Sequence, residues 1–180
     1  LEGGPGADTF SVGNLVGGSV SYEHSPASVI VELPRAGLLP GAASGGDATG
    51  DDVSNNDLDG IIGSAFADVL TGSDNFGSVI LGGDGDDTIT GLTTLQFSNV
   101  LFGQGGADTI VGGDGQDLIQ YDPQDLSYDF GLATAVTGFD DLLLTDQSLT
   151  LGGAGPVITN LDRIAVPETS AAAPITVTMN

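Results

Sequence analysis

The sequence predicts an all-β fold, a parallel β-roll in which short strands alternate with glycine-rich turns along a stack of coils. Three observations predict it. A nonapeptide of the form G-G-x-G-x-D-x-U-x, in which U is a large apolar residue, returns in register along the chain. The segments outside these repeats are short runs of β-forming residues bounded by glycine or proline. No segment combines helical periodicity with capping residues.

The segment before the array is expected to contain strands but no consecutive nonapeptides. Residues 1–11 fit the end of an upstream repeat, and Leu1-Glu2 fits the last two positions of a nonapeptide whose first seven residues are missing. We therefore expect the chain to be a fragment of a longer repeat protein. Residues 12–62 form a strand-rich segment between arrays, with strand-like runs at 19–22 and 28–33 and a glycine-rich loop at 41–52.

The repeat array spans 63–122 and is predicted to form the roll. Its repeats begin at Gly63, Gly72, Gly82, Gly91, Gly103 and Gly112. The second and fourth are longer than nine residues and lack the aspartate at position six. After the array, 123–166 holds apolar runs of strand length that we expect to cap the open core, and 167–180 is a linker-like tail with a terminal strand.

The last three residues of each repeat are predicted to be an extended strand whose single U side chain points inward. The predicted core residues are Leu70, Ile80, Ile89, Leu101, Ile110 and Ile119. The glycines at positions one, two and four are expected to let the backbone turn through positive φ, a region that side chains disfavour.

Two nonapeptides make one coil, so alternate turns stack on the same side of the roll. One side carries Asp68, Asp87 and Asp108, and the other carries Gly77, Asn99 and Asp117. Stacked carboxylates need a counterion, and the turns supply carbonyl oxygens. An all-oxygen ligand set predicts Ca²⁺ rather than Zn²⁺ or Cu²⁺. We expect one site between Asp68 and Asp87, one between Asp87 and Asp108, and weaker binding on the Asn99/Asp117 side.

The candidate calcium ligands are the position-six carboxylates and the carbonyl groups of the turn glycines. They are Asp8, Asp68, Gly82, Gly83, Gly85, Asp87, Gly103, Gly105, Gly106, Asp108, Gly112, Gly113, Gly115 and Asp117. Asp8 is expected to bind only with a partner turn upstream of Leu1 or in another chain. Asp84, Asp86 and Asp114 are expected to be outer-shell or solvent-facing charges.

The composition limits the classes of partner. Acidic residues number 25 against two basic ones, for a net charge of −23, so nucleic acid and anionic membrane surfaces are not expected partners, whereas cations are. Cysteine is absent, which excludes disulfides and thiolate metal sites. No apolar run is long enough to span a membrane, so we expect no direct membrane insertion.

These residues resemble the RTX (repeats-in-toxin) family of secreted calcium-binding proteins. The likeness covers 63–120, with 1–11 as a fragment, and 19–62 resembles the segment between arrays in hemolysin-type proteins. The resemblance implies a right-handed parallel β-roll, type I secretion from a Gram-negative bacterium, and folding triggered by calcium at the cell surface or outside the cell. It names the metal but no activity.

No catalytic constellation is apparent. The chain has one histidine, His24, and no cysteine, so a zinc protease helix and a thiol nucleophile are excluded within it. We expect a calcium-binding structural module of a secreted or cell-surface bacterial protein, not an enzyme. Two alternatives stay open: the secretion and stability module of a hydrolase, and an adhesin or surface-layer subunit. Other copies of the chain and a larger parent protein are therefore candidate partners.

Overall fold

The computed structural model describes residues 1–13, 17–35, 40–92, 97–131, 141–143, 149–151, 155–161, 163–165 and 177–179. Within these residues the chain is all β apart from one short 3-10 helix, η1 (Gly46–Ala48). The predicted all-β class is confirmed. The predicted linker at 167–174 lies outside the described residues.

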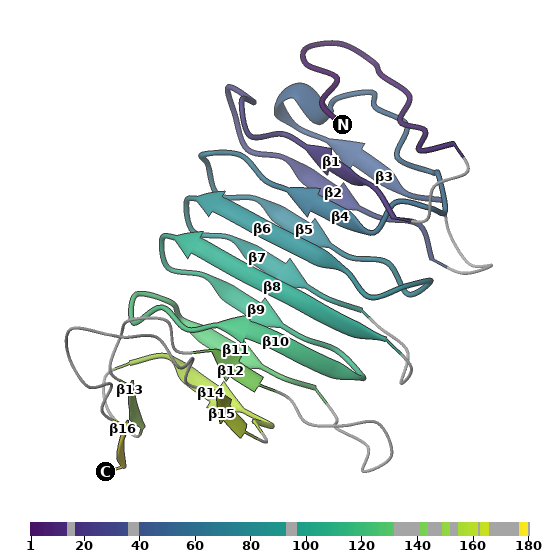
Figure 1. Ribbon diagram of the computed structural model, residues 1–180. Helices are drawn as coiled ribbons and strands as arrows, with labels where there is room; N and C mark the ends of the chain where they lie inside the picture. Colours follow the sequence, from purple (N-terminus) through teal and green to yellow (C-terminus); the bar gives the residue numbers. More distant parts are fainter. Residues whose placement is uncertain are drawn as a thin grey trace, which may run out of the picture.

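Two seven-stranded sheets face each other along the stack (Figure 1). Sheet 1 contains, in spatial order, β1 (Ser19–Ser21), β4 (Gly60–Ile62), β6 (Val79–Asp84), β8 (Ser98–Gly105), β10 (Gln116–Gln120), β12 (Asp141–Leu143) and β15 (Arg163–Ala165). Sheet 2 contains β14 (Val157–Thr159), β11 (Ser127–Asp129), β9 (Thr109–Val111), β7 (Thr88–Thr90), β5 (Val69–Thr71), β2 (Ile30–Glu32) and β3 (Ala42–Ser44). Separately, β13 (Leu149–Leu151) pairs with β16 (Val177–Met179).

From β4 to β11 the chain alternates between the two sheets, and each strand pairs in parallel with the strand one coil away. This is a parallel β-solenoid, and it confirms the predicted β-roll. Only β2 and β3 pair antiparallel among the described strands. The expected loop at 41–52 is wrong in part, because 42–44 forms β3 and 46–48 forms η1.

The core is a ladder of single side chains. The three-residue strands β5, β7 and β9 of the array each have a buried middle residue, because alternate side chains of a strand point to opposite faces. The pairing register stacks Ile61, Ile80, Leu101 and Ile119 in sheet 1. It stacks Leu70, Ile89, Ile110 and Tyr128 in sheet 2. All six predicted core residues are fully buried, as expected.

The strands outside the array belong to the same two sheets. β1 pairs with β4 and β2 with β5, while β12 pairs with β10 and β14 with β11. The N-terminal residue also joins the stack: the Leu1 amino group donates to Ser19 O at 2.6 Å, and Ser21 N–H donates to Leu1 O at 2.7 Å. The division into five segments stays a prediction.

The turn glycines serve two different purposes. Position two takes positive φ in the turns that begin at Gly82 and Gly103, where Gly83 has φ 110° and Gln104 has φ 73°. Position one does not take positive φ, so that part of the expectation is wrong. Gly82 is needed there for space instead: a Cβ would clash with the Asp87 carboxylate and lie 2.6 Å from the Gly103 carbonyl oxygen.

Candidate metal centre

One edge of the roll, where the chain passes from sheet 1 to sheet 2, carries a ladder of aspartates. The backbone N–H of Asp68 donates to Oδ1 of Asp87, and that of Asp87 donates to Oδ1 of Asp108, each at 2.8 Å. All three carboxylates are buried, with at most 2% of each residue exposed. The structure thus brings together the three aspartates that the sequence assigned to one side.

The ladder extends by one step in each direction. Val29 N–H donates to Oδ1 of Asp68 at 2.7 Å, and Asp108 N–H donates to Oδ1 of Asp125 at 3.2 Å. Sequence reasoning missed Asp125 because it lies beyond the array and one residue before Leu126, the residue that lies opposite Asp108 in the strand register and donates its N–H to Asp108 O. We name the turns that carry Asp68, Asp87, Asp108 and Asp125 the aspartate edge.

The second oxygens of Asp87 and Asp108 define the candidate site. Each Oδ2 is buried and accepts no hydrogen bond from the described residues. Oδ2 of Asp87 and the carbonyl oxygen of Gly103 both lie within 2.6 Å of the place where a Cβ on Gly82 would stand, so two acceptors lie close to one point. Buried polar atoms are almost always paired, and unpaired acceptors of this kind are what a bound cation satisfies.

The electrostatics of the ladder agree with an unmet need for positive charge. Burial raises the pKa of the Asp87 carboxyl to about 7, against the hydrogen bond from the Asp68 N–H and together with the nearby charges of Asp108 and Asp68. Burial also raises the pKa of Asp108. Each carboxylate is therefore costly to hold as an anion unless a cation accompanies it.

Asp68 is placed differently from its neighbours. Its Oδ2 accepts the Ser64 N–H at 2.5 Å, and the Ser64 hydroxyl lies 2.9 Å from Oδ1 and 3.0 Å from Oδ2. Ser64 stands at position two, where the full repeats have glycine. The sequence treats the Asp68/Asp87 and Asp87/Asp108 pairs alike, whereas in the structure a hydroxyl already satisfies one of the two Asp68 oxygens that face the site.

The opposite edge, where the chain passes from sheet 2 to sheet 1, carries Ser78, Asn99 and Asp117, and we name it the asparagine edge. Ser78 N–H donates to Oδ1 of Asn99 at 3.0 Å, so Ser78 occupies the position that the sequence assigned to Gly77. The one extra residue of that turn shifts the alignment. Nδ2 of Asn99 donates to Gly112 O at 3.0 Å and to Oδ1 of Asp117 at 2.7 Å.

Asp8 has a partner within the chain. Its N–H donates to Oδ1 of Asp51 at 2.8 Å, and its own Oδ2 is buried without a hydrogen bond. Oδ2 of Asp51 accepts the Tyr22 hydroxyl at 3.1 Å. The expectation that Asp8 needs a turn upstream of Leu1 or in another chain is wrong, because Asp51 approaches it across 43 positions of sequence.

The remaining candidate residues lie around these carboxylates. Three carbonyl oxygens lie close to where a Cβ on the first glycine of the preceding turn on the same edge would stand, those of Gly82, Gly103 and Gly112. The carbonyl oxygen of Gly85 lies in the same way close to Gly106. Asp84, Asp86 and Asp114 are exposed, as expected. No group of three or more acidic, histidine or cysteine side chains gathers at one point in the described part of the chain, so a cation here needs backbone carbonyl ligands as well.

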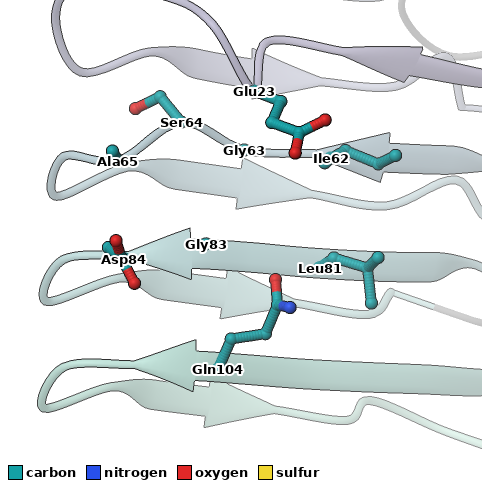
Figure 2. Close-up of a pocket in the computed structure, with 9 residues that line it drawn as sticks. All are labelled: Glu23, Ile62, Gly63, Ser64, Ala65, Leu81, Gly83, Asp84 and Gln104. Carbon is teal, nitrogen blue, oxygen red and sulfur yellow. The ribbon is translucent and has the colours of Figure 1, made fainter.

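A hollow of about 420 Å³ lies beside the aspartate edge (Figure 2). Ser64 and Ala65 line it on one coil, and Leu81 and Asp84 line it on the next. None of the position-six aspartates lines this hollow, so the candidate metal centre is the turn stack and not the hollow.

Among the described helices, none has the length and apolarity to cross a membrane.

Comparison with known proteins agrees with the geometry. The family model of the RTX calcium-binding nonapeptide repeat (4 copies) matches residues 77–94 and 92–119. Neither the curated proteins nor the solved structures include a significant match to the chain. The matched residues contain Asp87, Asp108, the full copy at Gly82 and the first eight residues of the copy at Gly112. Residues 77–119 therefore carry RTX calcium-binding nonapeptide repeats.

Proposed function

We propose that the chain is a calcium-binding structural module of a secreted or cell-surface bacterial protein, and that it folds when it meets extracellular calcium. The observation that carries the proposal is the pair of buried Oδ2 atoms that accept no hydrogen bond from the described residues, that of Asp87 beside Gly82 and the Gly103 carbonyl and that of Asp108 beside Gly103. RTX repeats occur generally in secreted bacterial proteins, which supports the location.

The donor set favours calcium over other metals. Carboxylate and backbone carbonyl oxygens are the ligands that Ca²⁺ prefers, with six to eight around each ion. The sequence contains no cysteine and one histidine, and His24 contacts Glu2 away from the ladder. A bound calcium ion would place positive charge between oxygens that otherwise repel one another.

The sites are not equivalent in this proposal. Asp87 and Asp108 form the principal site, because both present an open oxygen. The Asp68/Asp87 pair is second, since Ser64 competes for Asp68. The Asp117 side and the Asp8/Asp51 pair are weaker, since Asn99 and Tyr22 already donate to a carboxylate there. Carbonyl groups of the turn glycines at 82–85, 103–106 and 112–115 complete the ligand sets.

Calcium binding and folding are coupled in this proposal because the ladder exists only when the coils are stacked. Asp68, Asp87 and Asp108 come from turns far apart in sequence, and a chain with net charge −23 resists being compacted. Where a site is unformed in the unfolded chain, metal-binding energy becomes folding energy. The folded fraction of the chain would be low at intracellular calcium and high at the millimolar levels outside the cell.

A single-residue comparison tests the proposal. Calcium titration calorimetry and circular dichroism, with and without EGTA, are measured for the wild type, Asp87→Ala and Asp84→Ala. Both variants lose one negative charge, but Asp84 is exposed and Asp87 is in the ladder. We expect wild type and Asp84→Ala to gain β structure when calcium is added. Asp87→Ala should need at least a tenfold higher calcium concentration for the same gain. An identical spectrum of the wild type before and after chelation would refute coupled folding.

A further inference from the structure

Asp125 is the last aspartate of the aspartate edge among the described residues, and both of its oxygens are hydrogen-bonded. Oδ1 accepts the Asp108 N–H, as Oδ1 of Asp108 accepts the Asp87 N–H. Oδ2, the oxygen that is unpaired in Asp87 and Asp108, accepts the hydroxyl of Tyr128 instead. Asp125 is 4% exposed, so this is a buried contact and not a surface contact.

Tyr128 reaches Asp125 from the core. It pairs in register with Ile110 and is fully buried, so it is a core residue of the stack. Its ring packs on Tyr121 with centroids 6.2 Å apart. Its hydroxyl accepts the Asp122 N–H at 2.7 Å and has two acceptors within reach, Oδ2 of Asp125 and the Asp122 carbonyl oxygen at 2.9 Å. The carboxylate is the stronger acceptor of the two, because a hydrogen bond to a charged group is stronger than one to a neutral group.

Elsewhere in the stack, too, a hydrogen-bond donor of the protein contacts an acceptor that a cation would otherwise bind. Ser64 donates to Asp68, and Nδ2 of Asn99 donates to Asp117 and to the Gly112 carbonyl. Near the N-terminus the Tyr22 hydroxyl donates to Oδ2 of Asp51. Asp51 and Asp125 are therefore both buried aspartates bonded to a tyrosine, and Asp87 and Asp108, whose Oδ2 atoms accept no hydrogen bond from the described residues, lie between them in sequence.

We propose that Tyr128 is the positioning residue that closes the last described step of the ladder: its hydroxyl donates to Oδ2 of Asp125, so the Asp108/Asp125 step closes without a metal. A hydroxyl donor satisfies the carboxylate oxygen that a cation would otherwise bind. An ion at this step would have to displace this hydrogen bond to a carboxylate and leave the hydroxyl only the weaker Asp122 carbonyl acceptor. The inference rests on the proposed function, since it assumes calcium at Asp87 and Asp108.

Counting calcium ions per chain tests this inference. Equilibrium dialysis at saturating calcium compares the wild type with Asp108→Ala, Asp125→Asn, Tyr128→Phe and Tyr121→Phe. We expect Asp108→Ala to lose at least one ion, Asp125→Asn to lose none, and Tyr128→Phe to gain one ion at the freed oxygen. Tyr121→Phe is the matched control in the same ring pair and is expected to change nothing. The gained ion should disappear in Tyr128→Phe combined with Asp125→Asn.

Loss of one ion in Asp125→Asn would overturn the inference and leave the proposed function intact, whereas a wild type that binds no calcium would overturn both. Should these variants fail to fold, hydrogen exchange of the wild type decides. The Asp122 amide donates to Tyr128. During partial calcium removal, the factor by which its exchange rate rises should be at least tenfold smaller than the factor for the Asp87 amide. Equal acceleration at the two amides would contradict the inference.

Discussion

On the aspartate edge, Asp87 presents a carboxylate oxygen toward the carbonyl oxygen of Gly103, and nothing between them donates a hydrogen bond. On the asparagine edge, Asn99 stands at the equivalent place and presents an amide that donates to the Gly112 carbonyl and to Asp117. The backbone is the same on both edges: a buried Oδ1 accepts the N–H of the coil before. In the proposed function a cation binds where acceptor faces acceptor, and the Asn99 amide donor weakens that binding on the asparagine edge.

Converting the asparagine edge into a second aspartate edge should have the largest effect. Asn99→Asp replaces the amide donor with a carboxylate, which faces two further acceptors, Gly112 O and Asp117. Because this leaves a buried charge without a partner, we expect the free energy of unfolding in calcium-free buffer to fall by roughly 3 kcal/mol. We expect calcium to restore the loss and one more ion to bind per chain. Urea unfolding at low and high calcium, with calorimetry for the count, measures both. Equal destabilisation at both calcium levels would refute the comparison.

The reverse exchange should make the aspartate edge independent of metal. Asp87→Asn keeps the acceptor for the Asp68 N–H and supplies an amide donor facing the Gly103 carbonyl, as Asn99 does for Gly112. We expect calcium affinity at the principal site to fall at least tenfold while β structure in calcium-free buffer increases. Circular dichroism in EGTA reports the second effect. Asp84→Asn, at an exposed position, serves as the control and should show neither change.

The pH dependence should have opposite signs with and without calcium. The pKa of Asp87 is raised to about 7 in the folded chain, against about 3.9 when unfolded, so the calcium-free folded state holds the extra proton. This proton stabilises the calcium-free folded state fully below about pH 4, and the stabilisation is lost as the pH rises through 7. With calcium, protons compete, so affinity should increase up to about pH 7. Melting curves between pH 5 and 8 check this, and a calcium-free roll that gains stability with pH would be inconsistent with it.

The smallest expected effect concerns Ser64. In Ser64→Ala the hydroxyl no longer bonds to Asp68, although the backbone N–H contact remains. Losing a hydrogen bond to a charged group costs about 1–2 kcal/mol without calcium, and we expect severalfold tighter calcium binding at the Asp68/Asp87 pair. Calorimetry of the weaker of the two aspartate-edge sites measures it. Unchanged affinity there would mean that the Ser64 hydroxyl does not compete with the cation.

The nonapeptide period predicts the regular part of the molecule well. A fixed spacing places Ile89 and Ile110 in one core column and Asp87 and Asp108 in one ladder, since each follows from strand alternation and from counting turns. Insertions limit the method: one extra residue in the turn after Gly72 moves Ser78 into the place assigned to Gly77.

What the sequence does not reveal depends on contacts between distant segments. Asp51 meets Asp8 across 43 positions, and Asp125 joins the ladder from just outside the repeat pattern. Tyr128 occupies an ordinary core position, and only its hydroxyl distinguishes it from the isoleucine one coil away. A periodic pattern specifies which residues stack, but not which donor already satisfies a carboxylate.

The most direct test of the central claim is an anomalous-scattering map of crystals grown in saturating calcium. We predict a strong metal peak between Asp87 and Asp108, with ligands from both Oδ2 atoms and from backbone carbonyls, and no peak between Asn99 and Asp117 of comparable height. A map with no peak between Asp87 and Asp108, or with the stronger peak on the asparagine edge, would contradict the account.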